Sequence, residues 1–189
     1  MSVSGFPRLD EVDIWHRSAI NGFDAMEALA AAYPDIPHAI DPELSLQVIE
    51  IRGFTQLEWL TWRAERVEHQ ELFAIIALFA SFEGILKWDF RWRASERRAL
   101  HHQAFFHTLP RNPKVFVPMA RVLGCWKTVA TGLNDSQLEQ VVRRLEKNYQ
   151  DERNVLAHGR NITVTPFQKL YRNFTKAKAA FQSAVPDFL

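Results

Sequence analysis

The sequence has one cysteine and no long apolar run. A lone cysteine, Cys125, excludes an intramolecular disulfide bond and is typical of a protein from a reducing compartment. No apolar stretch approaches the roughly 18 residues that a membrane-spanning helix needs. Residues 1–13 also lack the basic and apolar regions of a signal peptide. We therefore expect a cytoplasmic protein that does not associate with a membrane.

Several motifs that bind cofactors are also missing. There is no phosphate-binding Walker loop, no glycine pattern of a dinucleotide-binding fold, no internal repeat and no low-complexity tract. His101, His102 and His107 lie close together, but their spacing does not give a pair of ligands four residues apart with a carboxylate nearby. Cys125 has no second cysteine to pair with at a metal. We expect neither a metal nor another cofactor.

The composition is that of a folded helical protein. Of the 189 residues, 47% are hydrophobic, and 6 Trp and 14 Phe provide large side chains for a core. Apolar periodicity and the positions of proline and glycine predict an all-α helical bundle, formed by a single domain over residues 1–189. We expect long antiparallel helices, a possible break near residues 67–70, and a short irregular segment around residues 162–164. The expected helices span 10–33, 55–93, 115–131, 136–159 and 167–184.

The helix expected over residues 136–159 has well-marked ends and one apolar face. Ser136 and Glu139 form the pattern of a capping box, and Gly159 is suited to end the helix. At about 100° per residue, the apolar residues form one stripe. Asn154 and His158 are four residues apart and lie on the opposite side, while Arg153 lies at the flank. This helix should therefore bury one face and present Asn154 and His158 on the other.

The segment Arg153–His158 resembles the Arg-Asn-x-x-x-His signature of the HEPN superfamily (higher eukaryotes and prokaryotes nucleotide-binding domains), of the bacterial plasmid or defence type. It stands near the end of a long helix, where that family carries it. Arg97 and His102 have the same spacing, but Arg97 is followed by arginine, and no glycine follows His102. The resemblance implies a small helical bundle.

The resemblance also implies a function. Many HEPN domains are homodimeric, metal-independent endoribonucleases or toxins, often encoded with a cognate antitoxin. In such an enzyme, His158 would act as general acid or base, Arg153 would bind the phosphate, and Asn154 would orient His158 or the phosphate. One Arg and one His per chain would suffice if two copies met in one cleft. The alternative is a non-catalytic HEPN-like module that dimerises and binds RNA, a nucleotide or a partner protein.

Glu83 is a carboxylate within a strongly apolar stretch, residues 72–86. A charge in such a place needs a partner, because burying it alone is costly. Some HEPN domains carry an acidic residue on an earlier helix near the Arg and His, so Glu83 is a candidate to orient Arg153 or His158. It could equally pair with Lys87, four residues later on the same helix.

Charge is unevenly distributed along the chain despite a net charge of +1. Residues 1–83 contain 5 Lys and Arg against 14 Asp and Glu, whereas residues 84–178 contain 18 against 7. The basic part could bind a polyanion such as RNA, or it could neutralise the acidic part within the fold or across a dimer. Basic residues alternate with aromatic ones after Gly84, either as an RNA surface or as the amphipathic end of a core helix. Our candidate RNA-binding residues are Lys87, Arg91, Arg93 and Arg160.

Overall fold

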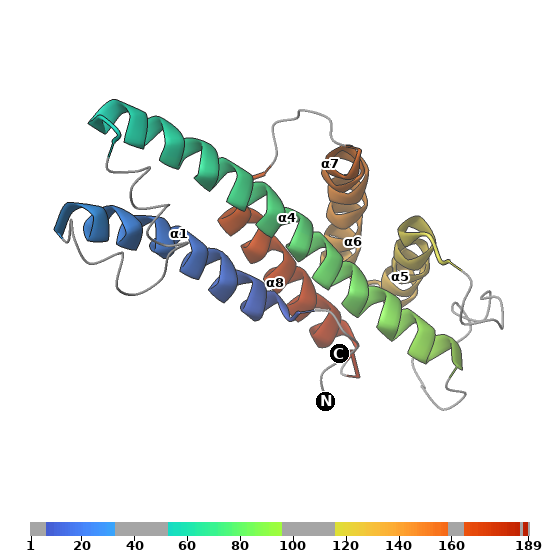
Figure 1. Ribbon diagram of the computed structural model, residues 1–189. Coiled ribbons are helices and arrows are strands. Elements are labelled where there is room, and N and C mark those ends of the chain that lie inside the picture. The colour runs from blue at the N-terminus through green and yellow to red at the C-terminus, as the bar shows by residue number, and fades with distance from the viewer. Residues whose placement is uncertain (1–6, 33–52, 96–115, 159–164, 186, 189) are drawn as a thin grey trace. The chain divides into compact units, whose positions relative to one another are not determined.

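A computed structural model describes residues 7–32, 53–95, 116–158, 165–185 and 187–188. These residues are almost entirely helical and include no strand, which confirms the prediction of an all-α bundle. None of the described helices combines the length and the apolar character that crossing a membrane requires. The elements, shown in Figure 1, are α1 (Leu9–Ala32), α4 (Gln56–Ser95), α5 (Met119–Leu133), α6 (Ser136–Asn148), the π turn η2 (Tyr149–Arg153), α7 (Asn154–Ala157) and α8 (Phe167–Ala184).

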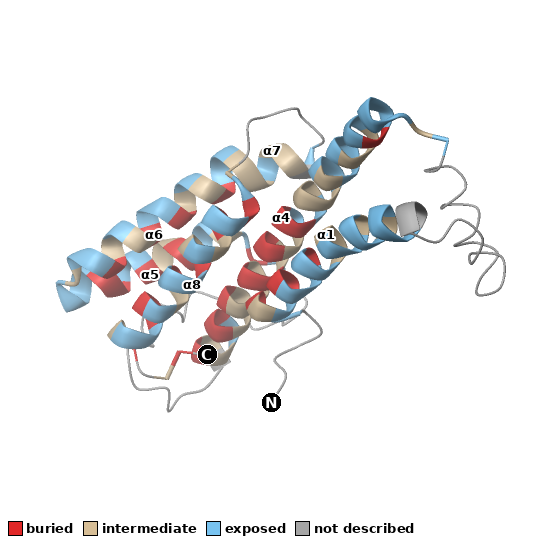
Figure 2. Cartoon of the chain, turned by 90° about the vertical axis from the view of Figure 1, so that its left-hand side faces the viewer, coloured by how far each residue is buried: buried red, intermediate tan, exposed pale blue. Residues whose placement is uncertain are grey.

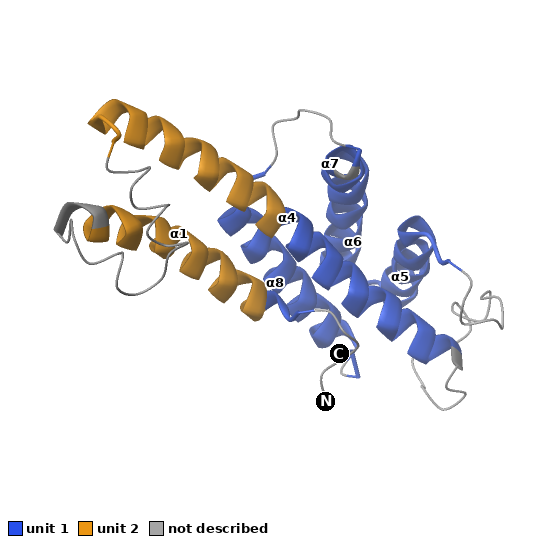
Figure 3. Cartoon of the chain, viewed as in Figure 1, with its two compact units in different colours: residues 1–9, 75–189 blue, residues 10–74 orange. Residues whose placement is uncertain are grey.

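The chain divides into two compact units of opposite charge (Figure 3). The acidic unit, residues 10–74, contains 13 Asp and Glu against 4 Lys and Arg, a net charge of −9. The basic unit, residues 1–9 and 75–189, contains 19 Lys and Arg against 9 Asp and Glu, a net charge of +10. The charge boundary that the sequence places after residue 83 therefore lies close to a structural one. That residues 1–189 form a single domain stays a prediction.

Aromatic rings form the core of the basic unit. Phe174 of α8 stacks on Phe82 of α4, with ring centroids 4.7 Å apart, and meets Phe79 edge to face at 5.3 Å. Trp126 of α5 contacts Phe181 of α8 in the same way, at 4.7 Å. α6 packs against both α5 and α8. Buried positions on α4 follow the helical period (Figure 2). The apolar stretch over residues 72–86 is therefore not buried all round: Phe73 and Ile76 are exposed.

The acidic unit pairs α1 with the first half of α4. Phe23 of α1 meets Trp62 of α4 edge to face at 6.1 Å, and Trp62 stacks on Trp59 at 5.3 Å. Arg63 of α4 donates to the Asp24 carboxylate of α1 at 2.5 Å. An aromatic and an ionic contact are thus among those that join the two helices.

Most helix ends agree with the prediction to within a few residues. α4 runs unbroken for 40 residues, so the possible break near residues 67–70 is absent. α5 starts four residues later than expected because the extended backbone of Pro118 (ψ 141°) precedes it. It ends at Leu133, two residues later than expected, and the cap is Asn134, whose φ of 55° is left-handed. The segment expected to be irregular, residues 162–164, lies outside the described residues.

The capping box predicted for the motif helix is wrong. Asp135 caps α6: its carboxylate accepts hydrogen bonds from the backbone N–H groups of Gln137 and Leu138, at 3.0 and 2.9 Å. Glu139 accepts from Arg143 instead of reaching back to the cap. An aspartate directly before Ser136 competes for the same amides, and its ionised carboxylate is the stronger acceptor.

A buried charge cluster holds the C-terminal segment against α4. Arg93 is 0% exposed, and it donates to Asp89 on its own helix and to Asp187, at distances of 2.9–3.1 Å. Its guanidinium also lies 5.2 Å from the ring centre of Trp126. Burial raises the pKa of Asp89 to about 6, although Arg93 opposes the shift; the nearby Asp187 adds to it. Two carboxylates thus share one buried cation.

We predict that Phe174→Ala destabilises the protein strongly, since it removes a ring packed against two others. The free energy of unfolding should fall by about 3–5 kcal/mol, measured by urea titration. The same change at Phe116, which is 74% exposed, should cost less than about 1 kcal/mol. Equal losses at the two positions would contradict this account of the core.

We also predict a pH-dependent difference between the wild type and Asp89→Asn. The pKa of Asp89 is higher in the folded than in the unfolded chain, so folding favours its protonated form. The stability that this residue contributes is therefore present at pH 4 and lost as pH rises through about 6, by at most about 3 kcal/mol. Urea titrations between pH 4 and 7 should show the wild type losing stability relative to Asp89→Asn. A difference that rises with pH would refute the assignment.

Candidate functional site

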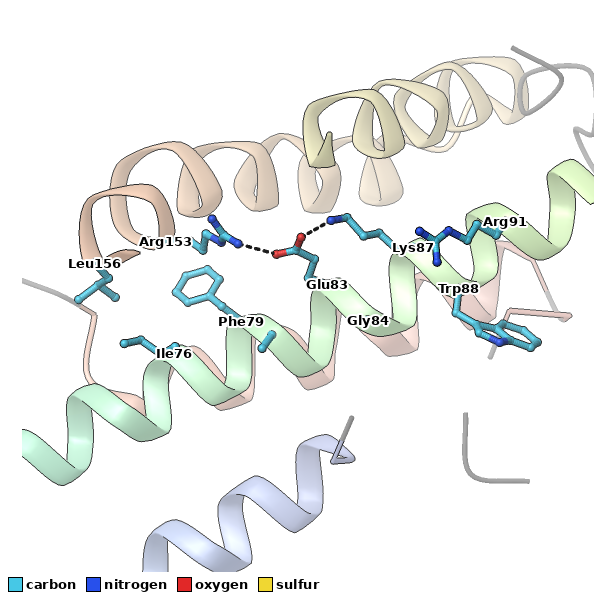
Figure 4. Close-up of a pocket in the computed structure, with 10 residues that line it drawn as sticks. Ile76, Phe79, Glu83, Gly84, Lys87, Trp88, Arg91, Arg153 and Leu156 are labelled. Atoms are coloured by element: carbon cyan, nitrogen blue, oxygen red, sulfur yellow. Dashed lines mark hydrogen bonds and ion pairs between the residues drawn. The ribbon is translucent and has the colours of Figure 1, made fainter. Parts of the chain in front are cut away.

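The site is organised by Glu83, whose carboxylate joins α4 to the end of η2. Its Oε2 accepts a hydrogen bond from Nη2 of Arg153 at 3.3 Å, and its Oε1 pairs with the ammonium group of Lys87 (Figure 4). Two of the three partners that the sequence suggested for Glu83, Arg153 and Lys87, are therefore present together. The contact places the arginine of the motif beside a carboxylate 70 residues earlier in the chain.

The two side chains of this ion pair differ in their exposure to water. The Glu83 side chain is 14% exposed, whereas that of Arg153 is 41% exposed. The carboxylate is thus mostly removed from water and neutralised by two cations. The guanidinium keeps donor groups open to solvent, and these donors remain available to an anionic ligand.

A second contact fixes η2 on α4. The hydroxyl of the buried Tyr149 donates to the backbone carbonyl of Phe79 at 3.3 Å, and the two rings meet edge to face at 5.3 Å. Burial and the nearby Glu83 raise the pKa of Tyr149 well above its usual value, against the opposing effect of Arg153, so the hydroxyl keeps its proton and remains a donor.

The π turn η2 changes the direction in which the motif residues point. It spans Tyr149–Arg153, directly before Asn154. A π turn holds more residues than an α turn, so a wheel drawn from Ser136 at 100° per residue does not carry through to residue 158. Such turns occur often at functional sites. Asn154 and His158 are nevertheless exposed, as predicted.

Two cavities adjoin the Glu83–Arg153 pair. We call them the larger cavity, of about 510 Å³, and the smaller cavity, of about 260 Å³. Glu83 and Arg153 line both. The larger cavity is otherwise lined by Ile76, Phe79, Ala80, Gly84, Lys87, Trp88, Arg91 and Leu156. The smaller cavity is otherwise lined by Phe116, Pro118, Met119, Ala120, Leu123, Glu146, Tyr149, Gln150 and Asn154.

The predicted site residues do not all lie together. Lys87 and Arg91 lie at the larger cavity, and Asn154 lies at the smaller one. His158 is exposed just after α7 and lines neither of these two cavities. Arg160 lies outside the described residues.

Arg93 corrects the predicted RNA surface. Its side chain is fully buried with Asp89 and Asp187, so it has no open face with which to contact RNA. The sequence left open whether the basic and aromatic residues after Gly84 form an RNA surface or the amphipathic end of a core helix. The structure divides them between a cavity and the core. Arg91 is exposed at the cavity, whereas Phe90 and Arg93 belong to the core.

Sequence reasoning did not identify Tyr149, Glu146 or Phe116 as site residues. Tyr149 was placed only in the apolar stripe, and nothing in the local sequence marks a π turn. Ala80 and Gly84, four residues apart on α4, were the available signal for a hollow, because small side chains leave space on a helix face.

The described part of the chain contains no cluster of potential metal ligands. No group of three or more His, Cys, Asp or Glu is arranged there to hold an ion. His101, His102 and His107 lie outside the described residues.

Comparisons with known proteins give no match. No protein-family model matches the chain, nor does any curated protein or any solved structure.

We predict that Glu83 and Arg153 are energetically coupled. A double-mutant cycle with Glu83→Gln and Arg153→Gln should give a coupling energy of about 1 kcal/mol, because one partner is shielded from water. The matched cycle on Glu139 and Arg143, a more exposed pair, should give about 0.3 kcal/mol. Both energies come from urea titrations. A coupling at Glu83–Arg153 no larger than at the surface pair would argue against a structural role for this contact.

Proposed function

We propose that this chain is a metal-independent endoribonuclease that acts as a homodimer, in the manner of the HEPN domains that it resembles. The observation that supports this most is the position of Arg153. Its guanidinium is held by Glu83 at the border of two cavities, and it remains 41% exposed. Lys87 and Arg91 add positive charge at the larger cavity. A phosphodiester is the ligand that such a cationic site favours.

Each motif residue has a role in the proposed reaction. The 2′-hydroxyl of a ribose attacks the neighbouring phosphorus, the bond from phosphorus to the 5′-oxygen breaks, and a 2′,3′-cyclic phosphate forms. A base takes the proton of the 2′-hydroxyl, and an acid supplies one to the leaving 5′-oxygen. His158 serves in these proton transfers. Arg153 binds the phosphate and the charge that develops on it.

Glu83 and Asn154 act as positioning residues. Glu83 holds one edge of the Arg153 guanidinium, so fewer orientations of the remaining donors need to be ordered when RNA binds. Asn154 shares the smaller cavity with Arg153 and can orient the phosphate or the histidine.

A second copy of the chain completes the proposed site. The transesterification needs two proton transfers, and the motif provides one histidine. His158 is exposed at the end of α7, where a partner can approach it. Two copies would supply two histidines and two arginines to one cleft. A cognate antitoxin is a further partner that this class of protein implies.

A non-catalytic binding module is the second candidate, and the cavity itself favours it. The larger cavity is walled by Ile76, Phe79 and Leu156, and its volume is in the range of ligand-binding pockets. Because His158 lies outside the two cavities, a nucleotide or a segment of a partner protein could bind in the larger cavity without being cleaved. In this case Arg153 and Lys87 would only bind.

We predict that His158→Ala abolishes ribonuclease activity. The purified protein is incubated with total bacterial RNA in EDTA, and cleavage is followed on denaturing gels. The wild type should cut, and His158→Ala should be slower by at least about 100-fold, because general acid–base catalysis is lost. His69→Ala, a change at an exposed histidine of α4, is the matched control and should cut at the wild-type rate.

The same experiment separates the two candidate functions. Sedimentation should show that His158→Ala remains a dimer. Cleavage that survives this change, or that stops in EDTA, would overturn the mechanism. A wild type that binds RNA without cutting it would favour the binding module, and its expression should then not arrest cell growth.

A further inference from the structure

The two cavities that Glu83 and Arg153 both line differ in their chemistry. The larger cavity combines apolar walls, from Ile76, Ala80 and Leu156, with cations. It offers surface for a ring but few groups that would read the edge of a base. The smaller cavity instead contains one carboxylate and two amides besides the ion pair, those of Glu146, Gln150 and Asn154. These are groups that discriminate between bases by hydrogen bonding.

A dinucleotide step of single-stranded RNA has the same order of parts. One phosphate links two nucleosides, and the partly exposed Arg153 lines both cavities. Lys87 adds to this charge from the larger cavity, and its ammonium group lies 4.6 Å from the ring centre of Phe116 at the smaller one. Phe116 is 74% exposed, so the face of its ring away from Lys87 is open for stacking.

A carboxylate such as that of Glu146 can distinguish guanine from the other three bases. An ionised carboxylate only accepts hydrogen bonds. The Watson–Crick edge of guanine presents two adjacent donors, N1–H and the N2 amino group. Adenine and cytosine present one donor beside an acceptor, and uracil presents one donor between two acceptors. Because Glu83 is already engaged by Arg153 and Lys87, the reading role falls to Glu146.

We therefore infer that a dinucleotide step of RNA straddles Arg153, with one base in each cavity, and that the smaller cavity selects guanine through Glu146. The larger cavity accepts any base, because a ring would lie against its apolar walls and its cations would face the phosphates. This inference rests on the proposed function, since it assigns a sequence preference to the RNA that the site would bind.

The test uses fluorescein-labelled RNA hexamers and the His158→Ala protein in EDTA, so that binding is measured without cleavage. One hexamer is uridine with a single central guanosine; in the second, inosine replaces the guanosine and removes only the N2 amino group. Fluorescence anisotropy should give a Kd about tenfold or more lower for guanosine, the effect of one hydrogen bond to a charged acceptor. Adding Glu146→Gln should reduce this ratio to within about threefold.

Two control variants keep the result interpretable. Glu139→Gln makes the same change on α6 outside both cavities and should keep the tenfold ratio. Ala120→Trp fills the smaller cavity from an exposed position of α5, so the guanosine hexamer should then bind only as tightly as the inosine hexamer. Thr128→Trp, at an exposed position of the same helix outside the cavity, should leave binding of the guanosine hexamer unchanged. If the two hexamers bind equally well before Glu146 is changed, or if Glu146→Gln leaves the ratio of their Kd values unchanged, the inference is overturned but the proposed function is not. Failure to bind either hexamer overturns the proposed function together with it.

Discussion

The site depends on one carboxylate that is placed where water reaches it poorly. Glu83 can remain charged inside an apolar helix because Arg153 and Lys87 both pair with it. The backbone carbonyl of Phe79, one turn before Glu83 on α4, accepts a hydrogen bond from the hydroxyl of Tyr149. Tyr149 in turn lies one turn before Arg153. These two contacts join positions four residues apart on each element. Together they fix both where η2 lies along α4 and how it is rotated, which a single contact could not do.

α4 carries a second carboxylate, Asp89, in a different setting. Asp89 and its partner Arg93 are fully buried, and Asp187 adds a second negative charge to the cluster. A cation enclosed in this way fastens the end of the chain to α4 and has no access to ligands. The Glu83 group differs because Arg153 remains partly open to water. Glu83 and Asp89 are six residues apart on α4, yet the ionic contact of Asp89 is suited to holding the structure together and that of Glu83 to binding a ligand.

Much of this arrangement could be anticipated from local sequence, and the failures have a common cause. The bounds of α8 and the long α4 follow from periodicity and from proline positions. The pairing of Glu83 was anticipated because a charge in an apolar run demands a partner. The burial of Arg93 could not be anticipated, because it depends on Asp187, 94 residues away. The π turn likewise reflects tertiary contacts of Tyr149, which no window of neighbouring residues contains.

The division of charge between the two units has a practical consequence for handling the protein. A sequence pI of about 8.0 suggests weak retention on any ion-exchange resin at neutral pH. Yet each unit by itself has a net charge of nine or ten, of opposite sign. Resins respond to local patches of charge as well as to the molecular total. The protein should therefore be retained by both cation and anion exchangers, and at low ionic strength the acidic unit of one molecule should attract the basic unit of another.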